Sequence, residues 1–171
     1  TVLNMFCYTG GFSFYAMRGG AALVHSVDSS SRAIDITRAN VELNFPGDAR
    51  HEAYAEDAFK YLDRMGDQYD LIILDPPAFA KHKDALRNAL IGYRKLNAKA
   101  FEKIRPGGIL FTFSCSQVVT KDNFRTAVFT AAAMSGRCVR ILHQLTQPAD
   151  HPVSIYHPEG EYLKGLVLYV E

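Results

Sequence analysis

Segments rich in apolar residues alternate with amphipathic segments along almost the whole chain. The apolar segments predict strands at 2–6, 22–27, 50–55, 69–74, 109–113, 139–145 and 162–170. Nearly continuous apolar runs of this length are typical of parallel strands that are buried on both faces. Helical patterns separate most of them, so the chain is predicted to be an α/β protein with a mostly parallel, seven-stranded sheet and helices on both faces.

The intervening helices have recognisable ends. Helical spacing predicts helices at 12–18, at about 30–44, in a short segment after Asp57, at 85–104 and at 121–134. Ser29 or Ser30 can cap the second of these, because a serine oxygen accepts a hydrogen bond from a backbone N–H of the first turn. Pro106 and Gly107 end the long helix. Neither an internal repeat nor a domain linker interrupts the pattern.

Composition narrows the class of protein. The 171 residues are 48% hydrophobic and 22% charged, which is typical of one globular domain. There is no apolar run of the roughly 18 residues that a membrane span needs and no secretory leader pattern. Three cysteines without CxxC spacing favour a reducing cytoplasm, and the six histidines lack metal-ligand spacing, so no metal is expected. The chain opens on a strand without Met, which predicts a piece of a longer protein.

A glycine-rich turn and two carboxylates point to a nucleoside-binding site. Gly10 and Gly11 follow the first strand, Asp28 ends the second, and Asp57 follows the third. Glycines permit close backbone approach, and a carboxylate at a strand end accepts hydrogen bonds from ribose hydroxyls. The turn lacks the full GxGxxG pattern for a pyrophosphate, so the pattern favours a cofactor without phosphates, such as S-adenosylmethionine. In the alternative interpretation, the two aspartates only cap helices.

The segment after the fourth strand carries the next signal. Asp75 is followed by Pro76 and Pro77, which continue neither a strand nor a helix and so hold a rigid, extended segment. Its carbonyl groups and the Asp75 carboxylate could hold the exocyclic amino group of a flipped base, with Phe79 stacked on the base. Turn formation alone would explain one proline.

Cys115 lies where the predicted strand 109–113 ends, at the edge where open α/β sheets carry their chemistry. A thiol beside a nucleotide crevice indicates covalent catalysis on a base, which requires the thiolate form. Cysteines in strands more often only pack, and Cys7 and Cys138 are interpreted in that way. Nothing in the sequence shows what promotes the thiolate of Cys115.

The region from Lys81 to Arg105 has eight basic residues against two acidic ones, in a chain of net charge +1. Lys95, Lys99 and Lys103 recur at helical spacing and could hold phosphates, or could form an ordinary solvated helix face. Lys81 and Lys83, nearest the predicted crevice, are the stronger candidates for contact with a nucleic acid.

Several segments together resemble a known family, from one end of the chain to the other. They are VLNMFCYTGGF at 2–12, VDSS at 27–30, LDPPAF at 74–79, FSCS at 113–116, ADHPV at 149–153 and PEGEYLKG at 158–165. The chain thereby resembles the S-adenosylmethionine-dependent ribosomal RNA large subunit methyltransferases that form 5-methylcytosine in bacterial 23S RNA.

The resemblance implies a Rossmann-like class I methyltransferase that binds S-adenosylmethionine and acts on RNA, specifically 23S rRNA, in the cytoplasm. It implies Cys115 as nucleophile, and Asn4, Tyr8, Gly10, Asp28 and Asp57 as residues that line the cofactor site. The predicted cofactor-binding residues also include Phe6, Thr9, Gly11, Ser29, Ala58 and Asp75. Asp75 is also the second predicted catalytic residue, because it could stabilise the protonated ring nitrogen or hold the amino group. The expected substrate-binding residues are Pro76, Pro77, Phe79, Lys81 and Lys83.

Two further points follow from the resemblance. Members of the family usually carry an N-terminal RNA-binding module of PUA type and a small connecting domain, which agrees with the start of this chain inside a strand. Better-known RNA cytosine methyltransferases have a second Cys directly after the paired prolines, used to release product, whereas this chain has Ala78. The identity of the base that assists release therefore stays open.

Three alternatives remain at the level of sequence. A related branch of methyltransferases modifies a guanine nitrogen of ribosomal RNA, which needs no thiol. A non-catalytic module that binds an adenosine-containing ligand or RNA is a second alternative. A dehydrogenase is disfavoured by the incomplete glycine pattern.

Overall fold

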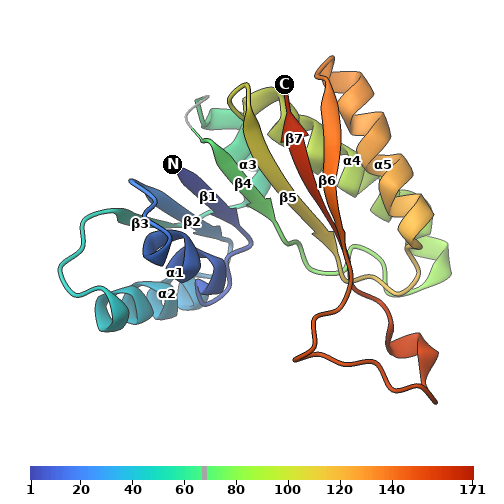
Figure 1. Cartoon of the computed structure of the whole chain (residues 1–171), viewed down its shortest axis with the longest axis horizontal. Coiled ribbons are helices and arrows are strands. Elements are labelled where there is room, and N and C mark those ends of the chain that lie inside the picture. The colour runs from blue at the N-terminus through green and yellow to red at the C-terminus, as the bar shows by residue number, and fades with distance from the viewer. Residues whose placement is uncertain (67–68) are drawn as a thin grey trace.

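The computed structural model describes residues 1–66 and 69–171. Seven strands and five α-helices alternate in the described chain (Figure 1). The strands are β1 (Val2–Met5), β2 (Val24–Asp28), β3 (His51–Ala55), β4 (Leu71–Leu74), β5 (Gly108–Ser114), β6 (Val139–Leu145) and β7 (Lys164–Val170). The helices are α1 (Gly11–Arg18), α2 (Ser31–Asn44), α3 (Ala58–Arg64), α4 (Leu86–Lys103) and α5 (Lys121–Ser135), with short 3₁₀ turns η1 (Lys83–Ala85) and η2 (Pro158–Gly160).

All seven strands belong to one sheet with the order β3-β2-β1-β4-β5-β7-β6. The pairings from β3 through β5 are parallel, while β7 runs antiparallel to both of its neighbours. The strand order reverses at β1, which lies between β2 and β4. This is the point where an open α/β sheet forms a ligand crevice beyond the carboxyl ends of its strands.

Helices cover the sheet on both faces, as the sequence predicted (Figure 1). The larger core lies under α3, α4 and α5, and includes Leu62, Tyr93, Phe101 and Phe124. A smaller core joins Met17 of α1 and Val41 of α2 to the sheet. The predicted mostly parallel Rossmann-like architecture is therefore confirmed.

The ends of the elements follow local chemistry. Ser30 caps α2 by accepting a hydrogen bond from the N–H of Ala33. The long predicted helix 85–104 begins one residue later, at Leu86, because η1 precedes it. β7 begins at Lys164, two residues after the predicted start, because residues 162–163 still belong to an irregular segment.

That irregular segment, residues 146–163, extends beyond the carboxyl edge of the sheet (Figure 1). It brings Tyr162 back to the same edge as the loops after β4 and β5. Within residues 1–66 and 69–171, no helix has the length and apolar character needed to cross a membrane.

Candidate active site

The turn after β1 has an uncommon backbone conformation. Phe6 and Tyr8 have positive φ angles of 58° and 49°, and Gly10 has a φ of 91°. Such angles cost a non-glycine residue energy, so the surroundings must hold them in place. The N–H of Gly10 donates to the carbonyl of Cys7 at 2.8 Å, which closes the turn on itself.

Side chains of helix α2 hold this turn through hydrogen bonds. The hydroxyl of Thr37 donates to the carbonyl of Tyr8 at 2.9 Å, and the side-chain amide of Asn40 donates to the carbonyl of Thr9 at 3.3 Å. A Cβ on Gly10 would lie 2.9 Å from side-chain atoms of Phe14 and Thr37, so this position has no room for a side chain. A Cβ on Gly11 would meet nothing within 4 Å, because Gly11 faces open space.

Asp28 connects the turn to the end of β2. Its Oδ2 accepts from the N–H of Tyr8 at 3.0 Å, and its Oδ1 accepts from the N–H of Ser30 at 2.9 Å. It is therefore more than a helix cap, a role that Ser30 fills. A carboxylate offers about four acceptor positions, so Asp28 can still accept hydrogen bonds from a ligand. Ser29 beside it is exposed.

Asn4 and Phe6 lie deeper than the rest of the predicted cofactor-binding residues. Asn4 is 1% exposed and donates to Ser13 Oγ at 2.9 Å, and Ser13 in turn bonds to Ser26. Asn4 therefore ties β1 to α1 and β2 beneath the turn. Its Oδ1 is buried and has no hydrogen-bond partner among the described residues. Phe6 is half-buried and packs against the larger core.

Asp57 is the N-cap of α3. Its Oδ1 accepts from the N–H groups of Phe59 and Lys60, both at 3.1 Å. The capping interpretation thus describes its contacts in the structure, although the exposed carboxylate keeps Oδ2 available at the end of β3. Ala58 is buried in the first turn of α3.

The segment after β4 presents Asp75 at the same edge. Asp75 is exposed, yet desolvation by the surrounding atoms raises the pKa of its carboxyl above the usual range. Pro76 is buried and Pro77 is exposed. Two rigid residues therefore follow the carboxylate directly.

The structure places Phe79 against α4 rather than free for stacking on a base. Its ring centroid lies 4.6 Å from that of Tyr93, and a Cβ on Gly92 would lie only 3.0 Å from the Phe79 ring. One face of the ring is already used for packing. The expectation that Phe79 stacks on a substrate base stays a prediction.

Cys115 directly follows β5 and faces the proline segment. Its Sγ lies 3.9 Å from the carbonyl oxygen of Pro76. The half-buried thiol lines a cavity of about 240 Å³, which we call the Cys115 cavity. The cavity is lined by Ala78, Ala80, Lys81, Cys115, Gln117 and Tyr162. Of the basic residues proposed from sequence, Lys81 therefore shares a cavity with the candidate nucleophile.

The groups around the Cys115 thiol have opposite effects on its pKa. Burial raises the pKa of Cys115 above 9.0, and the negative charge of Asp75 raises it further. The ammonium group of Lys164 acts in the opposite direction and lowers this pKa. The thiolate is thus disfavoured in the free protein. Backbone hydrogen bonds at Cys115 and Ala78 and the Lys164 ammonium partly offset the two unfavourable effects.

Two other expectations about cysteines had different outcomes. Cys7 is 5% exposed, and burial raises the pKa of its thiol to about 11, which agrees with a packing role. The same interpretation is wrong for Cys138, which is exposed. Cys138 lies just before β6, the edge strand of the sheet, where one side lacks a neighbouring strand.

The basic stripe on the long helix lies away from the crevice. α4 begins at the carboxyl edge of the sheet and runs 18 residues, so Lys103 lies at its far end. Lys99 forms an ion pair with Asp63 of α3. Of the two interpretations of Lys95, Lys99 and Lys103, this arrangement favours an ordinary helix face.

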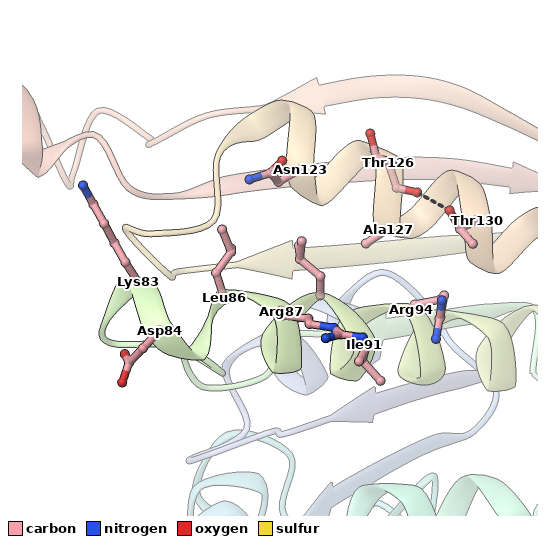
Figure 2. A pocket seen from close by; sticks show the side chains of 11 residues that line it. Lys83, Asp84, Leu86, Arg87, Ile91, Arg94, Asn123, Thr126, Ala127 and Thr130 are labelled. Atoms are coloured by element: carbon pink, nitrogen blue, oxygen red, sulfur yellow. Dashed lines mark hydrogen bonds between the residues drawn. The ribbon is translucent and has the colours of Figure 1, made fainter.

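A larger hollow of about 670 Å³ lies between α4 and α5 (Figure 2). We call it the α4–α5 groove. Lys83, Arg87 and Arg94 line one wall, and Asn123 and Thr130 of α5 line the other. It contains neither a nucleophilic thiol nor any of the strand-end carboxylates. The Cys115 cavity is smaller, but it contains the predicted nucleophile.

Sequence reasoning missed three residues near the thiol: Gln117, Tyr162 and Lys164. Lys164 had a signal, because a lysine that interrupts the start of an apolar strand is expected to have a partner when it is buried. Tyr162 and Gln117 lie in irregular segments, where periodicity gives no information about which way a side chain points. Among the described residues, no group of three or more potential metal ligands occurs.

The fold and this strand-end arrangement define a class of enzyme. The model of the S-adenosylmethionine-dependent methyltransferase family matches residues 1–158, and the chain belongs to this family. It is 46% identical over 170 residues to the ribosomal RNA large subunit methyltransferase I of Aeromonas hydrophila, which covers 98% of this chain. It is also 46% identical over 172 residues, or 99% of this chain, to the protein of the same name from Salmonella newport.

The chain spans about 43% of the length of these curated relatives. Two solved structures resemble it closely. One, described as a methyltransferase in complex with SAH, has a TM-score of 0.84 and 28% identity, and covers 99% of this chain and 44% of its own. The other, from Streptococcus mutans and described as SAM-dependent, has a TM-score of 0.83 and 26% identity over the same shares of both chains.

The residues of the turn fit the cofactor of this family, S-adenosylmethionine. Asp28 has free acceptor positions for ribose hydroxyls, and Gly11 faces open space where a ligand can approach the backbone. Neighbouring strands lie about 4.8 Å apart, and only β4 separates β1 from β5. The carboxyl ends of β1 and β5 are thus about 10 Å apart along the sheet.

Proposed function

We propose that the chain is the catalytic domain of an RNA cytosine-5 methyltransferase that works through a covalent adduct on Cys115. The observation that carries this proposal is the position of the Cys115 thiol. Its Sγ faces the carbonyl of Pro76, and the residue lines a cavity at the carboxyl edge of the sheet. A methyltransferase that acts on a nitrogen lone pair has no need of such a thiol.

The relatives support RNA as the substrate. Their names specify the large-subunit ribosomal RNA, and their identity to this chain extends over nearly all of its length. We propose 23S rRNA as the partner and the bacterial cytoplasm as the place of action. Lys81 in the Cys115 cavity and Lys83 at the mouth of the α4–α5 groove are the proposed contacts to the RNA backbone.

Covalent attack solves a chemical difficulty at cytosine. Carbon 5 is a poor nucleophile, and addition of the Cys115 thiolate at carbon 6 turns the ring into an enamine. The bound cofactor supplies an electrophilic methyl group on a sulfonium. When carbon 5 takes that methyl, the new carbon–carbon bond replaces the methyl–sulfur bond. The carbon 5 proton then passes to a base or to water. The Cys115 thiolate leaves as the ring double bond re-forms, and the proton on nitrogen 3 returns to the group that donated it.

Asp75 is the proposed proton donor to the ring nitrogen. Thiolate addition at carbon 6 places negative charge on nitrogen 3 of the base, which then needs a proton. Desolvation raises the pKa of Asp75, so this carboxylate takes up a proton more readily than an exposed one and can pass it to nitrogen 3. The carbonyl groups of the rigid proline segment are positioned to accept from the exocyclic amino group. With Ala78 in place of a second thiol, the described lining of the cavity includes no cysteine besides Cys115.

The decisive experiment traps the adduct. In RNA that contains 5-fluorocytidine, carbon 5 carries fluorine, which cannot be removed as the proton is. A covalent protein–RNA complex should therefore accumulate with the cofactor present and resist denaturation. Cys115→Ser should abolish it, whereas Cys138→Ser, which removes an exposed thiol, should leave it intact. Nucleoside analysis of labelled RNA should give 5-methylcytidine.

Other outcomes would point elsewhere. A methylated guanine with an undiminished Cys115→Ser variant would replace the proposal with nitrogen methylation. Cofactor binding in calorimetry without transfer to any RNA, including transcripts of the large-subunit RNA, would indicate a binding module.

A further inference from the structure

Lys164 is a buried cation beside the loop that carries the candidate nucleophile. It is 7% exposed at the start of β7, opposite Ser114 of β5 in the antiparallel register. Its Nζ donates to the carbonyl oxygens of Ser116 and Val119, both at 2.6 Å. Both acceptors belong to the β5–α5 loop, within four residues of Cys115.

A lysine in this position is costly in the absence of a matching charge. Among the described residues, no carboxylate lies within ion-pair distance of Nζ, and burial lowers the pKa of the lysine. An apolar side chain would fill the same space without that penalty. Two carbonyl hydrogen bonds explain the geometry but do not by themselves require a full charge, since a neutral donor would satisfy them.

The charges that face Lys164 identify what its own charge can act on. They are Cys115, whose thiolate raises the pKa of the lysine, and Lys121 at the start of α5, which lowers it. Lys121 is exposed and forms an ion pair with Glu161. The thiolate of Cys115 is therefore the anion that gains from the buried ammonium.

We propose that Lys164 is a positioning residue: it ties down the loop that carries Cys115 and places a buried positive charge near the thiolate. This inference rests on the proposed role of Cys115. It answers how a half-buried thiol next to a carboxylate can ionise often enough to attack a base. Because both interactions come from one side chain, the loop geometry and the charge are supplied together.

Other groups also face Cys115 and set the background. They are Asp75 after β4, Tyr93 on α4, and Lys81 and Tyr162 in the cavity wall. Asp75 raises the pKa of the thiol, which is opposite to the effect of Lys164. Lys81 is exposed, so solvent screens its charge more than that of the buried Lys164.

The test measures the thiol directly, without RNA or cofactor. The rate of iodoacetamide alkylation of Cys115 is followed from pH 6 to 10.5 by peptide mass spectrometry, in a Cys138→Ser background. In Lys164→Met the midpoint of the rate profile should move to higher pH, which lowers the rate three- to tenfold at any pH below the midpoint. Lys164→Arg should restore most of the rate, and Lys121→Met, which removes an exposed charge, should leave the midpoint unchanged.

The shape of the pH–rate profile distinguishes a lost charge effect on the thiol from a simple disruption of the loop in Lys164→Met. The plateau at high pH, where the thiol is fully ionised, should stay within about twofold of wild type if Lys164 acts on ionisation. An unchanged midpoint in Lys164→Met overturns the proposal, as does a loss of plateau rate with the midpoint in place.

A reciprocal measurement covers the case in which Lys164→Met does not fold. In Cys115→Ser the pKa of Lys164, followed by NMR of its ε-methylene, should fall relative to wild type, because interaction between two titrating groups is mutual. No change there would overturn the proposal. The alkylation result also stands apart from the proposed function: a shifted midpoint with no RNA adduct would retain the role of Lys164 and remove the cytosine chemistry.

Discussion

The turn after β1 and the loop after β5 lie at the same edge of the sheet, but different interactions hold them. The β1 turn is held by neutral hydrogen bonds to backbone groups from α2 and by one carboxylate on the N–H of Tyr8. The β5 loop is held by a buried ammonium on two carbonyls and by the hydroxyl of Ser116 on the carbonyl of Ala80 at 2.6 Å.

The difference matches what each segment has to do. A turn that binds a ligand needs backbone groups in a constant position. It gains nothing from a nearby group whose protonation changes. A segment that carries a nucleophile needs both a position and an electrostatic environment, and a buried cation supplies both. Variants at the two segments should therefore separate binding from reactivity.

The largest separation is expected at Asp75, which influences the thiol without holding it. In Asp75→Asn the negative charge that raises the pKa of Cys115 is gone. The thiol pKa should therefore fall, and alkylation of Cys115 at pH 7.5 should become severalfold faster. Methyl transfer to RNA should nevertheless fall about a hundredfold, because the acid for the ring nitrogen is lost.

Opposite movements of the two rates would be difficult to produce by misfolding. If both rates fell together, Asp75 would instead be holding the segment in place. If methyl transfer were unaffected, the assignment of Asp75 as the proton donor would be wrong.

On the binding side, Asp28→Ala should weaken S-adenosylmethionine binding about thirtyfold, or by about 2 kcal/mol, in calorimetry. The variant loses the ribose acceptor and the anchor of the Tyr8 N–H. Alkylation of Cys115 should not change. Asp35→Ala, which removes an exposed carboxylate from α2, is the matched control and should bind as wild type.

The two adjacent glycines of the turn offer a finer test. Gly10→Ala should lower the free energy of urea-induced unfolding by about 1 to 2 kcal/mol, because the residue has a φ of 91° and its Cβ would press on Phe14 and Thr37. Gly11→Ala should stay within about 0.5 kcal/mol of wild type in stability. Its added methyl enters open space beside the turn, so cofactor affinity should fall instead.

Equal losses of stability in the two variants would show that Gly11 is also needed for the backbone conformation. A Gly11→Ala variant with unchanged cofactor affinity would place the ligand elsewhere on the edge.

Much of this edge could be predicted from sequence, for a physical reason. Strand ends in a parallel sheet share one edge, so residues directly after apolar runs, such as Asp28, Asp75 and Cys115, could be placed together without coordinates. The cap at Ser30 was equally local, since it depends on three successive residues.

Contacts between distant segments were not predictable in this way. Phe79 packs against Gly92 and Tyr93 of α4, a contact that the sequence pattern did not reveal. Lys164 reaches the Cys115 loop through an antiparallel pairing of β7 with β5, which a pattern of apolar residues does not reveal. A cation that influences the thiol therefore came from a strand that the apolar pattern does not place next to β5.

The smallest expected effect concerns RNA, and it compares two lysines on either side of the start of α4. Lys81 lies in the Cys115 cavity, whereas Lys95 is exposed on the helix, away from the crevice. Lys81→Ala should weaken binding of a single-stranded RNA about threefold and reduce the slope of log affinity against log salt by about 0.7, the value for one phosphate contact. Lys95→Ala should change neither quantity. Fluorescence anisotropy titrations at several salt concentrations measure both, and an equal reduction in slope for Lys95→Ala would mean that the RNA also follows the exposed face of α4.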